Sequence, residues 1–160
     1  MKTALALAFL LSACPAGAST RRGTGAADKS FAKADAMLEK GSYAAAAALL
    51  KNLGDSLPAD DPLQTRVHER TGAVRLREGN LREAKKAFAA AIKAAQRLGA
   101  DESAAKAYTG MGLCLRREKN DEYALKFFKR ALRLDLDDGT RMFVDDQIRE
   151  IEGDPPVPAR

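Results

Sequence analysis

The sequence predicts an all-α fold, an α-solenoid of about three helix hairpins closed by a C-terminal capping helix. Three observations lead to this prediction. Alanine dominates the apolar residues, and alanine has the highest helix propensity. β-Branched residues, which strands favour, are few. A pattern of glycine, alanine and aromatic residues also recurs along the chain, which is typical of a helical repeat.

The chain has 160 residues, a length that favours a single domain. We expect a signal peptide over residues 1–13 and a flexible tether over residues 14–27, which are rich in Gly, Ser and Thr. The helical domain is expected over residues 28–152. The proline-rich residues 153–160 are expected to form a disordered tail.

The charge of the chain argues for a solvated surface. The 27 basic and 22 acidic residues leave a formal charge of +5, which raises the question of a nucleic-acid partner. However, the two signs alternate along the helical stretches, as in REGNLREAKKAF and RREKNDEYALKFFKR. Such alternation is typical of helix faces exposed to water, so no nucleic-acid partner is expected.

The first fourteen residues indicate export. Met1 and Lys2 precede an apolar stretch over residues 3–11, which is shorter than the roughly 20 residues of a membrane-spanning helix. Such a stretch is typical of a secretory signal. It ends in Leu11-Ser12-Ala13-Cys14, which resembles the bacterial lipobox. The resemblance implies that Cys14 is lipidated and becomes the first residue of a membrane-anchored protein. Since Pro15 rather than Asp follows, it also implies an outer-membrane location facing the periplasm.

Two other interpretations of this segment stay open. The small residues Ala16 and Ala18 flank Gly17, a pattern that also suits ordinary signal cleavage, and Cys14 would then be lost. Alternatively, residues 1–14 form the first core helix.

The sequence contains few residues that could form a metal site or a catalytic centre. One His (His68) and two Cys (Cys14 and Cys114) cannot form a closed zinc site with conventional ligands. No Ser/His/Asp order, glycine-rich phosphate loop or HExxH motif occurs. We expect His68 to pack between helices and Cys114 to be a buried, inert thiol. No enzyme activity, cofactor, metal or small-molecule substrate is expected.

Three segments of the chain align with one another: Ala27–Asp60, Thr65–Leu98 and Ala105–Asp138. Equivalent residues Ala46, Ala84 and Ala124 are separated by 38 and then 40 residues. The third segment reads AKAYTGMGLCLRREKNDEYALKFFKRALRLDLDD and resembles the tetratricopeptide repeat. The second segment matches that pattern at most positions and the first at fewer. The resemblance implies hairpins of two antiparallel helices and a role in protein binding.

The residues give physical support to this interpretation. Gly72 and Gly112 lie in the middle of first helices, where Gly costs about 1 kcal/mol relative to Ala. We expect the backbone of another helix to cross there. Ser42, Asn80 and Asn120 stand at equivalent places before the second helices and are favoured N-cap residues.

A last helix is predicted over Arg141–Glu152, with Thr140 as its N-cap. Its apolar face would cover the exposed end of the core, as a solenoid requires. A dimerisation surface is the alternative role.

In the tetratricopeptide family the first helices line a concave groove that holds a peptide. The resemblance implies a groove that runs from acidic residues (Asp28, Asp35 and Glu39) to basic ones. Its expected binding residues are Arg66, Glu69, Arg77, Lys106, Thr109, Arg116 and Arg117. We therefore expect a protein partner with an acidic segment, held by a lipid-anchored scaffold or assembly factor of a bacterial envelope complex. A soluble periplasmic or secreted adaptor is the alternative.

Overall fold

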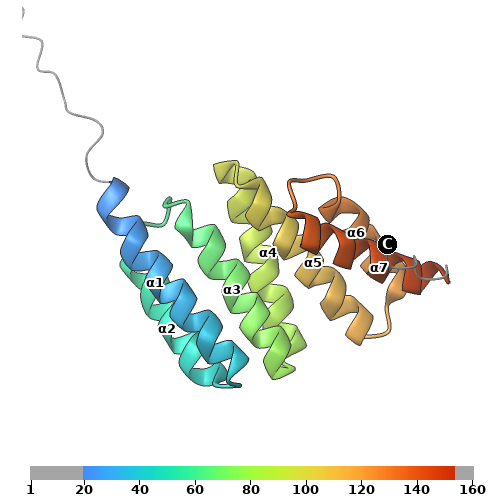
Figure 1. The fold of residues 1–160 in the computed structure, drawn as a ribbon, viewed down its shortest axis with the longest axis horizontal. Helices are drawn as coiled ribbons and strands as arrows, with labels where there is room; N and C mark the ends of the chain where they lie inside the picture. The colour runs from blue at the N-terminus through green and yellow to red at the C-terminus, as the bar shows by residue number, and fades with distance from the viewer. Residues whose placement is uncertain (1–19, 154–160) are drawn as a thin grey trace, which may run out of the picture.

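The structure, a computed structural model, describes residues 20–153. Within this range the chain forms seven helices joined by short connections and no strand, which confirms the predicted all-α solenoid (Figure 1). The helices are α1 (Thr20–Glu39), α2 (Tyr43–Ser56), α3 (Leu63–Glu78), α4 (Leu81–Leu98), α5 (Asp101–Arg117), α6 (Asp121–Ala131) and α7 (Asp138–Glu152).

Helices α1–α2, α3–α4 and α5–α6 form three hairpins, and α7 packs on α6 (Figure 1). The first helices also pack on one another, α1 on α3 and α3 on α5. No comparable contact joins α2 to α4 or α4 to α6 among residues 20–153. The first helices therefore form the inner, concave side of the array, and the second helices spread apart on the outer side.

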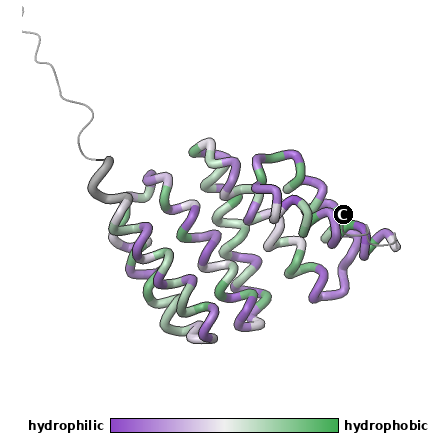
Figure 2. Tube along the Cα trace, viewed as in Figure 1, coloured by the Kyte–Doolittle hydropathy of each residue, from purple (hydrophilic) through white to green (hydrophobic). Residues whose placement is uncertain are grey.

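The core follows the repeat order. One cluster of buried apolar residues joins α1, α2 and α3, a second joins α3, α4 and α5, and a third joins the end of α4 to α7. Hydrophobic and hydrophilic positions alternate along these helices at helical spacing (Figure 2). Each hairpin thus completes its core only against its neighbours, as in other solenoids.

The mid-helix glycines make room for aromatic rings. A Cβ atom at Gly72 would lie 2.6 Å from the Phe88 ring, and one at Gly112 would lie 2.5 Å from the Phe128 ring. At both glycines the nearest atoms are those of a phenylalanine ring, not the helix backbone that the sequence led us to expect. Gly110, which the sequence did not single out, contacts the far edge of the same Phe88 ring.

The turns within the three hairpins share one left-handed residue. Gly41 (φ +73°) and Gly79 (φ +87°) occupy that position in the first two hairpins, and Lys119 (φ +59°) occupies it in the third. Residues with a Cβ atom are disfavoured in this conformation, so Lys119 carries backbone strain that the two glycines avoid.

The capping predictions are confirmed at one second helix. Asn80 accepts a hydrogen bond from the Glu83 amide at 3.2 Å. Ser42 and Asn120 stand at the N-cap positions of α2 and α6, but their side chains make no capping hydrogen bond.

Helix α7 begins earlier than predicted. Asp137, not Thr140, is its N-cap and accepts hydrogen bonds from the Thr140 amide at 2.9 Å and hydroxyl at 2.7 Å. These bonds satisfy a free amide of the first turn, so the helix starts at Asp138 and includes Gly139.

The boundaries of the domain also differ from the prediction. Helix α1 starts at Thr20, so residues 20–27 are helical where the tether was expected. Ala27, the last residue of the expected tether, is buried in the first core cluster together with Phe31. Gly153 caps α7 with φ +79° instead of belonging to the tail. The signal peptide, Cys14, residues 14–19 of the tether and tail residues 154–160 lie outside the described residues and stay predictions.

Candidate protein-binding groove

The concave side holds a cleft of about 460 Å³ between three helices. Helix α3 contributes Leu76 and Arg77, and α5 contributes Leu113, Arg116 and Arg117. Phe143 and Gln147 of α7 complete the wall. Helix α7 was expected to act as a cap, and it also forms one side of the groove.

Three arginines at this cleft have different roles. Arg116 of α5 bonds to Gln147 at 2.6 Å and to Glu150 at 2.7 Å, so it joins α5 to α7. Arg117 donates to the backbone carbonyl of Leu76 and thereby joins α5 to α3. Arg77 is exposed and forms no ion pair with any residue between 20 and 153. Arg77 is thus the cation of this cleft that is best placed to meet a partner.

The N-terminal half of the groove is held by ion pairs between α1 and α3. Arg66 contacts Asp28 at 2.8 Å, and its guanidinium lies 4.2 Å from the centroid of the Phe31 ring. Arg70 contacts Asp35 at 3.3 Å. Arg70 was not singled out from the sequence, although it stands one helical turn after Arg66 and therefore shares its face.

Glu69 lies beneath these pairs and is only 7% exposed. Burial raises the pKa of its carboxyl group, while the nearby Arg70 and Lys106 act in the opposite direction. The Glu69 carboxyl group is therefore buried next to two positively charged side chains. So little of the Glu69 carboxylate is exposed that it offers a partner almost no surface.

Lys106 and Thr109 of α5 each bond within their own helix. Lys106 bonds to Glu102 on its own helix at 2.6 Å. Thr109 is buried and donates its hydroxyl proton to the Ala105 carbonyl at 3.0 Å. Neither residue lines the cleft between α3, α5 and α7.

The structure therefore brings together three of the seven expected groove residues, Arg77, Arg116 and Arg117. The expected change from acidic to basic along the groove is largely cancelled. Asp28 and Asp35 are paired with arginines of α3, and Arg116 is paired with Glu150. The sequence missed these partners because each pair joins helices distant in the chain.

His68 and Cys114 lie where the sequence placed them. Cys114 is fully buried, and burial raises the pKa of its thiol to about 11, so it is protonated at neutral pH. His68 is half-buried between α2 and α3, and burial lowers its pKa below 6.5. The imidazole is therefore mostly neutral near pH 7.

The described part of the chain, residues 20–153, contains no cluster of three His, Cys, Asp or Glu residues that could hold a metal ion. None of its helices combines the length and the apolar character needed to cross a bilayer.

Residues 64–137 match the family model of the tetratricopeptide repeat. The matched range covers α3 to α6 and the connection to α7, which are the two hairpins with the strongest sequence pattern. No curated protein matches the chain. The match supports a protein with tetratricopeptide repeats, and such repeats are generally non-catalytic modules that bind other proteins.

Proposed function

We propose that this protein is a lipid-anchored scaffold or assembly factor of a bacterial envelope complex. Cys14 would carry the lipid at the outer membrane, on the periplasmic side, and the concave groove would hold a segment of a partner protein. Two observations support the proposal: the lipobox-like sequence that ends at Cys14, and the match of residues 64–137 to a family of protein-binding repeats.

The observation that carries the binding role is the cleft between α3, α5 and α7. Its lining includes the apolar side chains of Leu76, Leu113 and Phe143, and Phe143 is 42% exposed. Arg77 stands at its rim without an ion pair among the described residues. Apolar side chains with an unpaired guanidinium suit a segment that presents an apolar side chain next to a carboxylate.

The second candidate is a soluble periplasmic or secreted adaptor. The small residues Ala16 and Ala18 favour it, because cleavage after Ala18 would remove Cys14. The two candidates share the groove and differ only in the anchor.

Metabolic labelling with a fatty-acid probe separates them. The wild-type chain should be labelled and the Cys14→Ala variant should not. Equal labelling of both chains, or labelling of neither, would contradict the lipid anchor.

The groove is tested by crosslinking and pull-down from the membrane fraction with an Arg77→Glu variant. Arg82→Glu on α4 is the matched control, because Arg82 is also exposed and unpaired within residues 20–153 but does not line the cleft. The Arg77 variant should lose its crosslinked partner, and the Arg82 variant should keep it. Arg116→Glu is a poorer test, since it would also break the bonds that hold α7.

A further inference from the structure

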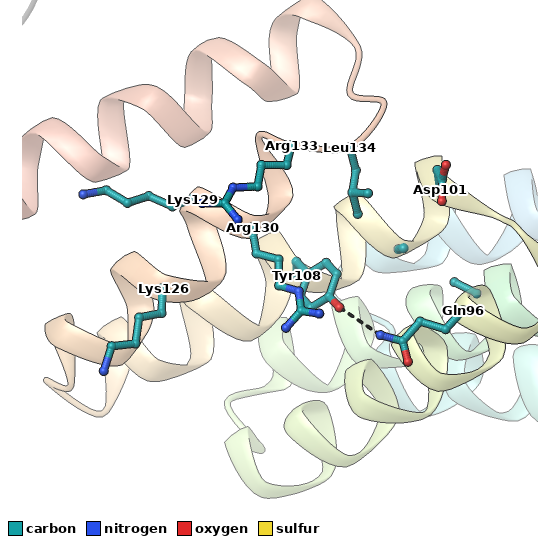
Figure 3. Close-up of a pocket in the computed structure, with 10 residues that line it drawn as sticks. Gln96, Asp101, Tyr108, Lys126, Lys129, Arg130, Arg133 and Leu134 are labelled. Carbon is teal, nitrogen blue, oxygen red and sulfur yellow. Dashed lines mark hydrogen bonds between the residues drawn. The ribbon is translucent and has the colours of Figure 1, made fainter.

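The outer side of the array has a cleft of its own, of about 570 Å³, between the second helices α4 and α6. It exists because these two helices spread apart and leave the start of α5 uncovered between them. We call it the outer cleft. Its cations are Lys126, Lys129, Arg130 and Arg133, and its floor includes Tyr108 and Leu134 (Figure 3).

The positive charge of the outer cleft is concentrated on one side. Lys129 and Arg130 stand three and four positions after Lys126, so all three lie on one side of α6, and Arg133 follows in the turn after it. Lys126 to Arg130 span about 6 Å along the helix axis, at about 1.5 Å per residue. Asp101 is the one carboxylate of the lining, and Figure 3 shows it on the side away from these cations.

Two of the four cations have no acidic partner in the described residues. Lys126 pairs with Glu122 at 2.7 Å and Lys129 pairs with Glu152 at 2.6 Å. The Lys126 pair is more than half exposed, so it contributes little and is readily exchanged. Arg130 and Arg133 form no ion pair within residues 20–153, although each guanidinium can bind a carboxylate through two parallel hydrogen bonds.

Arg130 lies over the ring of Tyr108 at the floor of the cleft. Its guanidinium lies 5.1 Å from the centroid of the Tyr108 ring, within range of a cation–π contact. Tyr108 is only 4% exposed, and its hydroxyl oxygen accepts a hydrogen bond from Gln96 at 3.3 Å. The buried ring and this bond make Tyr108 the base on which the exposed Arg130 guanidinium lies.

We propose that the outer cleft is a second protein-binding site, and that it takes an acidic peptide segment. Two carboxylates of the segment bind Arg130 and Arg133, one each, and an adjacent apolar side chain rests on Leu134 beside the buried Tyr108 ring. The apolar floor and the carboxylate of Asp101 favour a peptide over a nucleic acid, whose binding rests on phosphate contacts along a longer positive track. The site is independent of the concave groove.

The corresponding cleft between α2 and α3 lacks this character. It has a volume of about 650 Å³, and its lining includes three alanines, Ala44, Ala47 and Ala48. There Lys51 is paired with Asp55, and Arg75 with Glu78. Of these two clefts, only the outer cleft is lined by arginines that form no ion pair within residues 20–153.

The test uses fluorescence anisotropy with the full chain and a panel of labelled helical peptides. Each peptide carries two Glu residues three or four positions apart around one Phe, and a matched peptide carries Gln instead. We expect the acidic peptides to bind at least tenfold more tightly than their Gln counterparts. Equal binding of the two sets, or no binding of either, would overturn the proposal.

Two double variants with the same change in charge then locate the peptide. Arg130→Gln with Arg133→Gln should weaken binding at least tenfold. Arg77→Gln with Arg82→Gln, which removes Arg77 from the concave groove and a second exposed arginine outside it, should change it less than twofold. A reversed pattern would place the peptide in the groove and overturn the outer site while leaving the groove hypothesis intact.

Two further measurements test the chemistry of the outer cleft. Asp101→Asn should tighten binding of the acidic peptides, because it removes the one opposing carboxylate of the lining. A single-stranded oligonucleotide of equal charge should bind more weakly than the peptides in 150 mM salt. Tighter binding of the oligonucleotide would show that the site prefers phosphate and would overturn the assignment to an acidic peptide.

Discussion

Replacement of Gly110 by Ala tests how neighbouring hairpins pack. Gly110 of α5 lies against the far edge of the Phe88 ring, which belongs to α4, and Gly72 of α3 lies against another part of the same ring. Phe88 is only 2% exposed. A new methyl group at Gly110 would overlap the ring, and the ring cannot swing away because Gly72 closes the other approach.

The expected effect is the difference of two contributions. Overpacking a well-filled core costs up to about 3 kcal/mol, and the tight contact favours the upper end of that range. Ala is better than Gly inside a helix by about 1 kcal/mol. Gly110→Ala should therefore destabilise the protein by about 2 kcal/mol.

The sign of this effect should reverse when the ring is shortened. The nearest atoms to a Cβ at Gly110 are Cζ, Cε1 and Cε2 of Phe88, and Leu has none of them. In a Phe88→Leu background, Gly110→Ala should become neutral or stabilise by up to about 1 kcal/mol. Gly72→Ala should stay destabilising there, because its contacts include Cγ and Cδ1, which Leu retains.

Urea denaturation followed by circular dichroism at 222 nm measures these differences. The four chains needed are the wild type, each single variant and the double variant, with the corresponding Gly72 set as the control. If Gly110→Ala is equally destabilising with Phe and with Leu at position 88, the clash with the ring is not its cause, and the packing argument fails.

Three further predictions concern single residues. Lys119→Gly should stabilise the protein by about 1 kcal/mol in thermal unfolding, because Gly adopts the left-handed turn without strain, and no gain would refute that source of strain. The His68 ring should titrate below 6.5 in NMR spectra. Since the unfolded chain then binds the proton more tightly, stability from this group is present above pH 6.5 and lost as the pH falls, and His68→Gln should remove that part of the pH dependence. Cys114 should react with a thiol reagent at pH 8 only after denaturation, because it is buried and its pKa is raised to about 11, so rapid labelling of Cys114 in the native protein would contradict this.

The fold could be predicted at positions where the residue type and its place in the repeat indicate one structural role. Asn80 before α4 and the residues Ala124 and Phe128 of α6 are such positions, and the structure places them as N-cap and core. The predicted hairpins therefore agree with the observed ones. Gly110 was missed because its role depends on a ring from the preceding hairpin, and no local pattern reports that approach.

The candidate site was predictable only in part. The sequence identifies which residues stand on the first helices, so Arg77, Arg116 and Arg117 could be assigned to the concave side. The pairing of Arg66 with Asp28, and of Arg116 with Glu150, depends on the angle between successive hairpins. That angle is set by packing over the whole array, and the sequence pattern of one repeat does not contain it.

The same limit explains why the outer cleft could not be predicted from the sequence. Lys126, Lys129 and Arg130 can be seen to share a helix face, but the sequence alone treats them as a solvated surface. Their place beside Tyr108 follows from the gap between α4 and α6, which only the structure reveals.

The proposal that the concave groove holds a partner protein is tested most directly by crosslinking in living cells. A photoreactive amino acid is placed at Leu113 in the groove, and at Lys86 on the exposed side of α4 as the control. The Leu113 chain should give one defined crosslinked product, which Arg77→Glu abolishes, and the Lys86 chain should not give it. The same product from both positions, or a Leu113 product that persists with Arg77→Glu, would contradict the proposed groove.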